Sequence, residues 1–442
     1  MGQHAVADWN KIRASHRRVR HRYGHKAPRR GRHRRIGSQR FSPARVNPHR
    51  GHRQHHAEDV EKVVHYDHRP PPSDDQSTMV ISKGGGAASE PSFSAKLVGT
   101  FHDDEAIHFL ANVHIGTNPS PFQLLADTGS SVLWVKGQRA SSTASHSDDG
   151  AVFRPKSSET CKTTGDTFKV AYTAGKVSGT VYRDTVSLGR EDSQLSLSDV
   201  SFGVADRASA DLTDDDSDGV LGLAPIFHTD GKSGSTILRE IFKQGKEQGK
   251  MSRSVMSIFL GRPSSGTADR SEITFGGIHA EGELFHGPIT YVPLLTTTHF
   301  WKFRAASFGV ADAADEHTIG PVDAVIDTGT TLIHAPTAQA EAFWAGVPGA
   351  KKQGADTKFD SFWAFPCAQE IHALLKLPDG TAFSIASQDM NLGKVSAGSD
   401  QCVGALYALD GADFVLGEAA LKSLYTVLDW SERRIGLARA IG

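Results

Sequence analysis

One short pattern occurs twice in this chain and constrains its fold more than any other feature. The first copy, FQLLADTGSSVLWV at residues 122–135, places the tripeptide Asp-Thr-Gly between two apolar runs. The second copy, AVIDTGTTLIHAP at residues 324–336, repeats the tripeptide 200 residues later. A carboxylate between apolar flanks predicts a strand that leads into a tight turn and presents an acid. We expect the glycine to allow a backbone conformation that residues with side chains rarely adopt.

A second shared motif follows each tripeptide. The pattern D-x-V-L-G-x-A stands at residues 218–224 and again at residues 413–419. Its glycine lies 93 residues after the first Asp-Thr-Gly glycine and 88 residues after the second. A single Asp-Thr-Gly is typical of an ordinary polar turn, whereas two ordered motifs in both halves indicate an internal duplication. The duplication predicts that Asp127 and Asp327 are brought together by the fold.

Length and composition favour a β-rich protein of two domains. With 442 residues, the chain is longer than one ordinary hydrophobic core requires. Its 44 glycines and its many Ser, Thr and Val residues are typical of strands joined by turns, with helices in the minority. We expect a strand at His108–Ile115, a hairpin at Phe168–Leu188, and helices at Ser235–Gly245 and Thr337–Trp344.

With these motifs the chain resembles a pepsin-type aspartic protease, from about Leu97 to the C-terminus. The segments YTAG (172–175) and VSGT (177–180) resemble the flap hairpin of that family, and RIGLA (434–438) resembles its closing strand. The stretch GPITYVPLLTTTHFWKF (287–303) is most similar to the polyporopepsin-like enzymes of basidiomycete fungi. The resemblance implies an all-β, bilobal pepsin-like acid protease fold with a few short helices.

In that fold, two pseudo-symmetric β-lobes have the active-site cleft between them. The resemblance divides the chain into a basic, disordered, propeptide-like region at 1–93, an N-terminal lobe at 94–285, and a C-terminal lobe at 286–442. The N-terminal lobe would hold the first Asp-Thr-Gly and the flap, and the C-terminal lobe would hold the second Asp-Thr-Gly.

The resemblance also implies an aspartic endopeptidase that cleaves proteins at acidic pH without a cofactor or a metal. Two carboxyl groups held close together cannot both ionise cheaply, so Asp127 and Asp327 would share one proton, and aspartic proteases are the standard example of this coupling. The ionised member would act as general base on a water, and the protonated member would polarise the scissile carbonyl. The sequence leaves open which aspartate holds the proton.

Neighbouring residues receive roles from the same resemblance. Tyr172 matches the flap tyrosine that covers the bound peptide, and Trp134 matches the tryptophan that orients it, although such rings also simply fill cores. Gly175 belongs to the flap, where Thr173 replaces the first glycine of the usual Y-G-x-G. Val220 corresponds to a residue that lines the primary specificity pocket. Support of the two acids is implied for Thr128, Gly129, Ser130, Thr328, Gly329 and Thr330.

The three cysteines divide unevenly. Cys367 and Cys402 resemble the disulfide pair of the family's C-terminal lobe, which leaves Cys161 as a buried thiol in the first lobe. One disulfide fits an oxidising compartment, and a reduced pair is the alternative.

The first 90 residues differ from the rest in charge. They carry a net charge of +11 against −12 for the remainder, and the Arg- and His-rich part at 1–56 shows no helical or strand periodicity. We expect it to be disordered. Three interpretations stay open: a cationic propeptide that leaves the acidic enzyme at low pH, a nucleic-acid-binding segment without the usual interleaved aromatics, or an incorrectly assigned N-terminus.

Localisation and partners follow from the family more than from the chain. The resemblance implies an extracellular or vacuolar monomer that binds peptides in an extended conformation. The first 100 residues contain no apolar core of a secretory signal, and no apolar run is long enough for a membrane span. No metal-binding H-E-x-x-H or paired-Cys motif occurs. The competing class is a pepsin-like binding or inhibitor protein without catalysis, although both Asp-Thr-Gly copies are intact.

Overall fold

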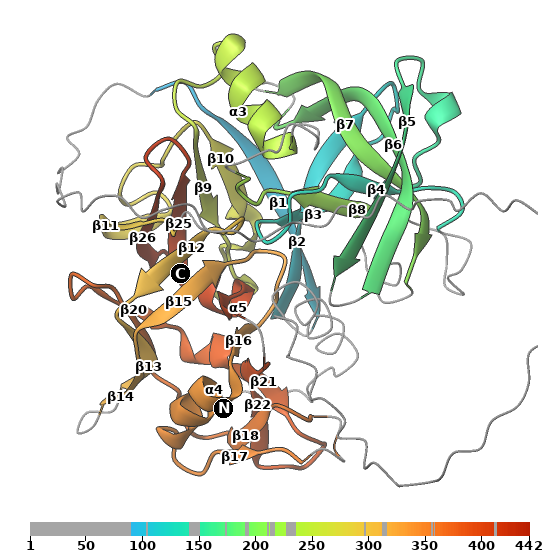
Figure 1. Ribbon diagram of the computed structural model, residues 1–442. Coiled ribbons are helices and arrows are strands. Elements are labelled where there is room, and N and C mark those ends of the chain that lie inside the picture. Colours follow the sequence, from blue (N-terminus) through green and yellow to red (C-terminus); the bar gives the residue numbers. More distant parts are fainter. Residues whose placement is uncertain are drawn as a thin grey trace, which may run out of the picture. The chain divides into compact units, whose positions relative to one another are not determined.

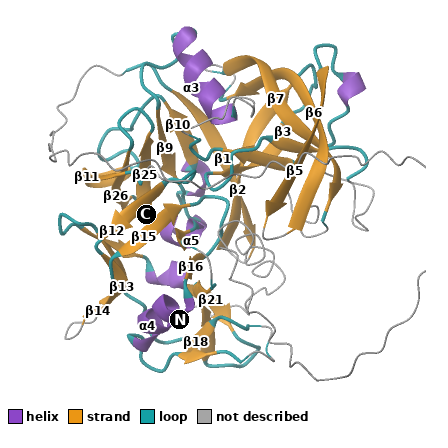
Figure 2. Ribbon diagram, in the orientation of Figure 1, coloured by secondary structure: helices purple, strands orange, loops and turns teal. Residues whose placement is uncertain are grey.

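The computed structural model describes residues 90–442 except 103–104, 141–150, 173–174, 191–193, 210–211, 213–216, 227–235, 296–297, 312–315, 355–356, 358 and 411–412; the side chains of 101–107 and 316–317 are also not described. Residues 1–89, and with them most of the expected basic region, lie outside the described residues. All described residues belong to one compact unit. Strands dominate this unit (Figure 2), which confirms the all-β prediction.

We divide the described chain into a first half, which ends with β10, and a second half, which begins with β11. The strands of the first half are β1 (Phe93–His102), β2 (Glu105–Ile115), β3 (Phe122–Asp127), β4 (Trp134–Lys136), β5 (Lys162–Tyr172), β6 (Gly175–Leu188), β7 (Leu195–Ala208), β8 (Gly219–Gly222), β9 (Val255–Phe259) and β10 (Glu272–Phe275). Its helical segments are α3 (Ile237–Glu247) and the short 3-10 turns η2 (Pro155–Ser157), η3 (Pro263–Ser265) and η4 (Ala268–Arg270).

The second half contains shorter strands. They are β11 (Phe285–Pro293), β12 (Lys302–Ala305), β13 (Ser307–Ala311), β14 (Glu316–Ile319), β15 (Val322–Ile326), β16 (Ile333–Ala335), β17 (Lys351–Lys352), β18 (Trp363–Pro366), β19 (Ala373–Lys376), β20 (Ala382–Ile385), β21 (Asn391–Lys394), β22 (Gln401–Gly404), β23 (Leu406–Ala408), β24 (Phe414–Leu416), β25 (Leu424–Asp429) and β26 (Arg434–Ala440). Its helical segments are α4 (Thr337–Ala345), α5 (Glu418–Leu421) and η5 (Ser387–Met390).

The same strand arrangement occurs once in each half. In the first half, β8 lies between β3, to which it is parallel, and β4, to which it is antiparallel, and β4 pairs in parallel with β7. In the second half, β24 lies in the same way between β15 and β16, and β16 pairs in parallel with β23. The repeated sequence motifs therefore occupy equivalent strands, with each Asp-Thr-Gly at the end of β3 or β15.

A 13-stranded sheet joins the two halves. Its order is β11-β26-β25-β9-β10-β1-β2-β3-β8-β4-β7-β6-β5, so strands from the C-terminal end pair with strands of the first half. Figure 1 shows β1 between β10 and β2. Residues 93–96 of β1 pair with β10, and residues 97–102 pair with β2. The expected boundary between residues 285 and 286 falls at the start of β11, which pairs with β26.

One cluster of buried apolar side chains includes residues of both halves. The strands β3 and β15 bury almost every side chain and do not alternate between core and solvent, as expected where a strand is covered on both faces. The two aspartates therefore stand at the ends of apolar strands inside the molecule.

The helices agree with their predicted type and differ slightly in extent. Helix α3 begins at Ile237, because the hydroxyl of Thr236 caps it by accepting a hydrogen bond from the main-chain N–H of Arg239 at 3.4 Å. The residue expected to begin this helix, Ser235, lies outside the described residues. Helix α4 covers the predicted segment and ends one residue later.

Candidate active site

The glycine of each D-x-V-L-G motif allows its strand to pass very close to the loop that follows Asp-Thr-Gly. A Cβ atom on Gly222 would lie 2.5 Å from the main-chain nitrogen of Val132. A Cβ atom on Gly417 would lie 2.2 Å from the carbonyl oxygen of Leu332. No side chain fits at either position. The second repeated motif thus supports the first one directly, because its glycine packs against the loop that follows Asp-Thr-Gly.

The two aspartates accept matching hydrogen bonds. Asp127 Oδ1 accepts from the main-chain N–H of Gly129 at 2.9 Å, and its Oδ2 accepts from the hydroxyl of Ser130 at 2.5 Å. Asp327 accepts the equivalent bonds from residues 329–330, at 2.9 Å from the amide and 2.6 Å from the hydroxyl. Both side chains are buried. Two donors fix the orientation of each carboxyl group.

The threonines of the two tripeptides bind each other's loops. The hydroxyl of Thr128 donates to the carbonyl of Ile326 at 2.9 Å and accepts from the amide of Thr328 at 3.0 Å. The hydroxyl of Thr328 donates to the carbonyl of Ala126 at 2.6 Å and accepts from the amide of Thr128 at 3.1 Å. Each hydroxyl thus serves as donor and acceptor across the junction, so the loops are held together symmetrically by buried hydrogen bonds.

Gly329 shows how close the loops come. A Cβ atom built on it would lie 2.3 Å from Asp127 Oδ1, so only a glycine leaves room for the carboxylate of the other loop. Its φ is not in the left-handed region, and neither is that of Gly129. The expectation that these glycines serve an unusual backbone conformation is therefore wrong. At Gly329 the reason is close approach between the halves.

Two aromatic residues expected near the substrate meet in the first half. The indole Nε1 of Trp134 donates to the phenol oxygen of Tyr172 at 2.8 Å, and the ring centroids are 6.4 Å apart. Val220 on β8 lies directly opposite Trp134 on β4, and all three side chains belong to one small buried cluster. The structure brings these three expected residues together in a cluster that also contains Leu125 of β3, the strand that ends at Asp127.

The expected flap is the hairpin of β5 and β6. In its register Tyr172 pairs with Gly175, which has a φ of +149°. A Cβ atom on Gly175 would lie 2.3 Å from Cβ of Ser209, so glycine is required at this end of the hairpin. Residues 173–174, which include the departure from Y-G-x-G, lie outside the described residues.

Comparisons with known proteins agree with this geometry. The family described as "Eukaryotic aspartyl protease" matches residues 108–440. This chain belongs to that family. It is 32% identical over 320 residues to "Aspartic protease" of Phaffia rhodozyma, which covers 71% of this chain and 72% of the relative. It is 30% identical over 325 residues to "Endothiapepsin" of Cryphonectria parasitica (73% and 72%) and 27% identical over 351 residues to "Major aspartyl peptidase 1" of Cryptococcus neoformans (76% and 69%).

As a eukaryotic aspartyl protease, the chain is an aspartic endopeptidase that hydrolyses peptide bonds of protein substrates. Its fold is the bilobal, mainly β fold of the pepsin-like enzymes. The predicted family and activity are thereby confirmed, and the relatives agree with the expected similarity to fungal enzymes.

The second half of this protease holds a histidine where the first half holds Trp134. His334 follows Asp327 by the same seven positions, and it lies opposite Val415 as Trp134 lies opposite Val220. Its ring lies 5.7 Å from that of Tyr407. Burial, with a contribution from the nearby charge of Asp327, raises the pKa of Tyr407 well above its usual value. Sequence reasoning missed both residues, although numbering each half from its aspartate would have singled out His334.

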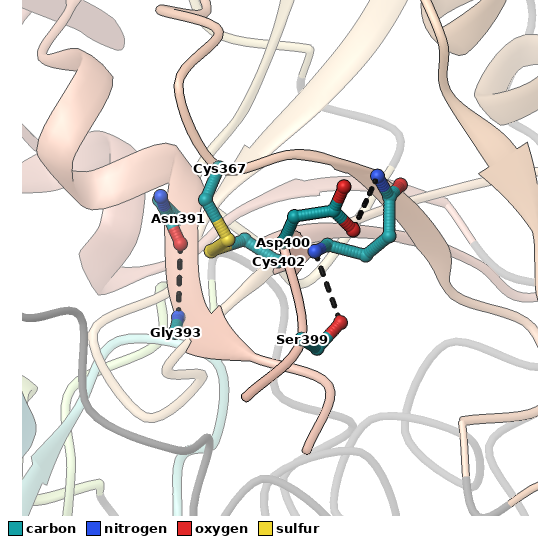
Figure 3. Close-up of a disulfide and its surroundings, with 7 residues drawn as sticks. Cys367, Asn391, Gly393, Ser399, Asp400 and Cys402 are labelled. Carbon is teal, nitrogen blue, oxygen red and sulfur yellow. Dashed lines mark hydrogen bonds between the residues drawn. A yellow bond between two sulfur atoms is a disulfide. The ribbon is translucent and has the colours of Figure 1, made fainter. Parts of the chain in front are cut away.

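The protease has a disulfide in its second half. Cys367 and Cys402 are bonded, as predicted, and Figure 3 shows them beside the turn that contains Asp400. The bond fastens the end of β18 to β22. In the first half Cys161 is a free, partly buried thiol, and burial together with the charge of Asp184 raises its pKa to about 11.

Within the part of the chain that the structure describes, no group of three or more His, Cys, Asp and Glu side chains is arranged to hold a metal ion. No helix there is both long and apolar enough to cross a membrane.

Proposed function

We propose that Asp127 and Asp327 are the catalytic pair of this endopeptidase and that it works at acidic pH. The observation that carries the proposal is the approach of the two loops, in which Asp127 Oδ1 lies against Gly329 beside the second aspartate. Like charges held this close repel, so the pair retains one proton while the second carboxyl group is ionised. Acidic pH keeps the shared proton in place.

The hydrolysis then needs only this pair and a water molecule. The ionised carboxylate removes a proton from water, whose oxygen attacks the scissile carbonyl carbon while the other carboxyl group donates a hydrogen bond to the carbonyl oxygen. The tetrahedral intermediate collapses as its C–N bond breaks and a proton passes to the amine nitrogen. The hydroxyls of Ser130 and Thr330 each bond to the Oδ2 atom of their aspartate, which keeps both carboxyl groups in fixed orientations.

The substrate in this proposal is an extended peptide between a lobe of residues 94–285 and a lobe of residues 286–442. Tyr172, held by Trp134, would cover it as part of the flap and exclude water. Val220 would line the primary pocket, which favours a hydrophobic residue next to the scissile bond. The burial of all three side chains in one cluster with Leu125 of β3, the strand that ends at Asp127, supports these roles.

Maturation belongs to the same proposal. Residues 1–93 carry a net charge of +11, and the remaining residues carry a net charge of −12. A cationic propeptide bound to an acidic enzyme dissociates when the carboxylates of the enzyme become protonated. We therefore infer a monomeric zymogen that is activated by acid and acts in the extracellular space or a vacuole. If N-terminal sequencing of fully active enzyme found Met1 in place, this part of the proposal would be wrong.

Peptide hydrolysis tests the catalytic pair. It would be measured from about pH 2.5 to about pH 7, with and without pepstatin, on wild type, Asp127→Asn and Asp327→Asn. We expect activity at acidic pH that pepstatin abolishes and that falls by about a thousandfold or more in each variant, since each removes a group that transfers a proton.

Asp323→Asn is the matched control. Asp323 lies on β15, the same strand that leads to Asp327, but its carboxylate pairs with Arg304 at 2.7 Å at the surface. This variant should keep wild-type activity. Full activity in a folded Asp327→Asn protein would contradict the proposed pair, and a fully inactive Asp323→Asn protein would show that the assay reports folding and not chemistry.

A further inference from the structure

We propose that Trp301 is a positioning residue, which fixes the two catalytic loops relative to each other from behind. This inference rests on the proposed roles of Asp127 and Asp327. Trp301 is fully buried and directly precedes β12. It belongs to the stretch 287–303, which the sequence marks only by its resemblance to fungal enzymes.

Trp301 bonds to both catalytic segments at once. Its carbonyl oxygen accepts from the main-chain N–H of Ile326, the residue before Asp327, at 2.9 Å. Its indole Nε1 donates to the carbonyl oxygen of Leu223 in the first half, also at 2.9 Å. The main-chain N–H of Leu223 in turn donates to the carbonyl oxygen of Asp127 at 2.7 Å. One residue thus connects the main chain at the first aspartate with the main chain at the second.

The other half has no counterpart to this bond. The register of β2 with β3 pairs Leu110 with Leu125, and the register of β12 with β15 pairs Lys302 with Val325. Numbered from the two aspartates, the residue equivalent to Trp301 is therefore Phe109. A phenyl ring has no N–H and cannot donate to a carbonyl. An indole of the second half therefore donates to the main chain of the first half, and Phe109 cannot make the reciprocal bond.

Other rings hold the indole in place. The ring of Trp430, next to the end of β25, lies 6.4 Å from that of Trp301 at an interplanar angle of 69°. Phe242 of α3, in the first half, lies 5.9 Å from Trp430 at 63°. Edge-to-face pairs of this kind are favourable and restrict rotation of the rings. The indole therefore approaches Leu223 from a packed aromatic cluster and not from a flexible loop.

A second point of attachment matters because the chemistry depends on distance. The Thr128–Thr328 bonds join the loops through the threonine that follows each aspartate. The bond from Trp301 to Leu223 adds an attachment on the other side, through the main chain that bonds to Asp127. Misplacing reacting groups by about 1 Å can lower a rate about a hundredfold, and the separation of two carboxyl groups sets how strongly they share a proton.

The test compares two Trp→Phe variants of the full chain after acid activation. Trp301→Phe removes the indole N–H, keeps an aromatic ring and makes the second half resemble the first. Trp344→Phe is the control, because Trp344 is also buried and its Nε1 also donates to a leucine carbonyl at 2.9 Å, that of Leu406 in its own half. The measurements are kcat and KM for a peptide, the pH profile of kcat, and the thermal midpoint of unfolding.

We expect Trp301→Phe to lower kcat by about tenfold or more with KM within about twofold of wild type, and to shift the pH profile. Both variants should lower the thermal midpoint of unfolding by a similar amount, because each loses one buried indole hydrogen bond. Trp344→Phe should leave kcat and the pH profile unchanged. Wild-type kcat and pH profile in Trp301→Phe, with a thermal midpoint like that of Trp344→Phe, would overturn the inference and leave Trp301 as a core residue.

Two additions keep the test decisive. If Trp301→Phe does not fold, the same measurements are made with benzothienylalanine at position 301, in which sulfur replaces the indole N–H and the bicyclic shape is kept. A retained kcat there would also overturn the inference. Asp327→Asn is assayed in parallel: activity in that variant contradicts the catalytic pair itself, whereas an inactive Asp327→Asn with a fully active Trp301→Phe contradicts only the role of Trp301.

Discussion

In the first half, the residue seven positions after the aspartate is Trp134, whose indole donates to Tyr172 of the β5–β6 hairpin. In the second half the same position holds His334, whose ring lies beside Tyr407 on β23, a strand inside the core. The main-chain framework is repeated, and the side chains on it have diverged. The first half uses this position to hold Tyr172 at the end of β5, while the second half uses it within a buried sheet.

The carboxylates that begin the two D-x-V-L-G motifs differ in the same way. Asp218 accepts main-chain N–H bonds from Gln123 and Ala151 at 2.8 and 2.7 Å, and burial nevertheless raises its pKa. Asp413 instead pairs with Lys302 at 2.7 Å. What the two halves share is the geometry that presents an aspartate. A duplicated pair of aspartates therefore needs a symmetric backbone but tolerates different side-chain support in each half.

The largest expected effect on stability concerns the disulfide, which lies in the second half, whereas Cys161 in the first half is free. Replacing Cys367 and Cys402 together with Ser should lower the free energy of unfolding by about 3–4 kcal/mol, because the bond closes a loop of 35 residues in the unfolded chain. Cys161→Ser should change it by less than about 1 kcal/mol. Urea unfolding of both variants measures this. Equal losses of unfolding free energy in the two variants would show that the disulfide stabilises the second half no more than the free thiol stabilises the first.

The threonine pair should behave symmetrically. Thr128→Val and Thr328→Val should each destabilise the protein by about 2–3 kcal/mol, because each leaves a buried carbonyl and a buried N–H without partners. Thr426→Val is the control, since that buried hydroxyl makes only a long bond of 3.5 Å to Leu424. Thermal unfolding and kcat would be compared. A difference above about 1 kcal/mol between the two would show that the halves depend unequally on this junction.

The bond between Trp134 and Tyr172 belongs to the first half alone. Tyr172→Phe should lower kcat/KM by about fivefold to tenfold, because it removes the acceptor of a buried indole N–H, worth about 1 kcal/mol. Tyr182→Phe, on the return strand of the same hairpin, is the control. The measurement is kcat/KM for a peptide at acidic pH in both variants and in wild type. An unchanged kcat/KM in Tyr172→Phe would mean that the ring needs no hydrogen bond to cover the substrate.

The smallest expected effect concerns His279, beside the strands that join the halves. Its Nε2 lies 2.6 Å from Glu272 and its Nδ1 lies 3.1 Å from Glu283. The hydrogen bond to Glu272 raises the pKa of His279. Burial alone would raise the pKa of Glu272. The hydrogen bonds that Glu272 accepts, chiefly the one from His279, outweigh burial and lower its pKa. The contribution of His279 is thus present below its unfolded pKa of 6.5 and lost above its folded pKa, and that of Glu272 is present above 4.5 and lost in acid.

His279→Gln should therefore lower stability most between about pH 4.5 and about pH 6.5, by no more than about 1 kcal/mol since the pair is partly exposed. Above the folded pKa of His279 the difference from wild type should disappear. Thermal unfolding across this range measures it. A difference that is constant with pH would assign the effect to packing against Tyr425 and not to charge.

The sequence by itself determined the family, the fold class and the acids to examine. Asp-Thr-Gly and D-x-V-L-G repeat in order along the chain, and apolar flanks, glycines and periodicity are properties of neighbouring residues. That is why β3, β15 and α4 could be expected from local patterns. The pairing of Cys367 with Cys402 came from resemblance, which carries the tertiary structure of relatives implicitly.

Only the tertiary structure decided which residues meet across the chain. Gly329 is needed because the carboxylate of Asp127 lies against it, and the indole of Trp301 finds its acceptor 78 residues away in Leu223. Neither contact can be predicted from the neighbouring residues, because glycine and tryptophan occur in a strand-rich chain for many other reasons. A contact between distant segments depends on how the sheets pack, and that packing is set by the whole core at once.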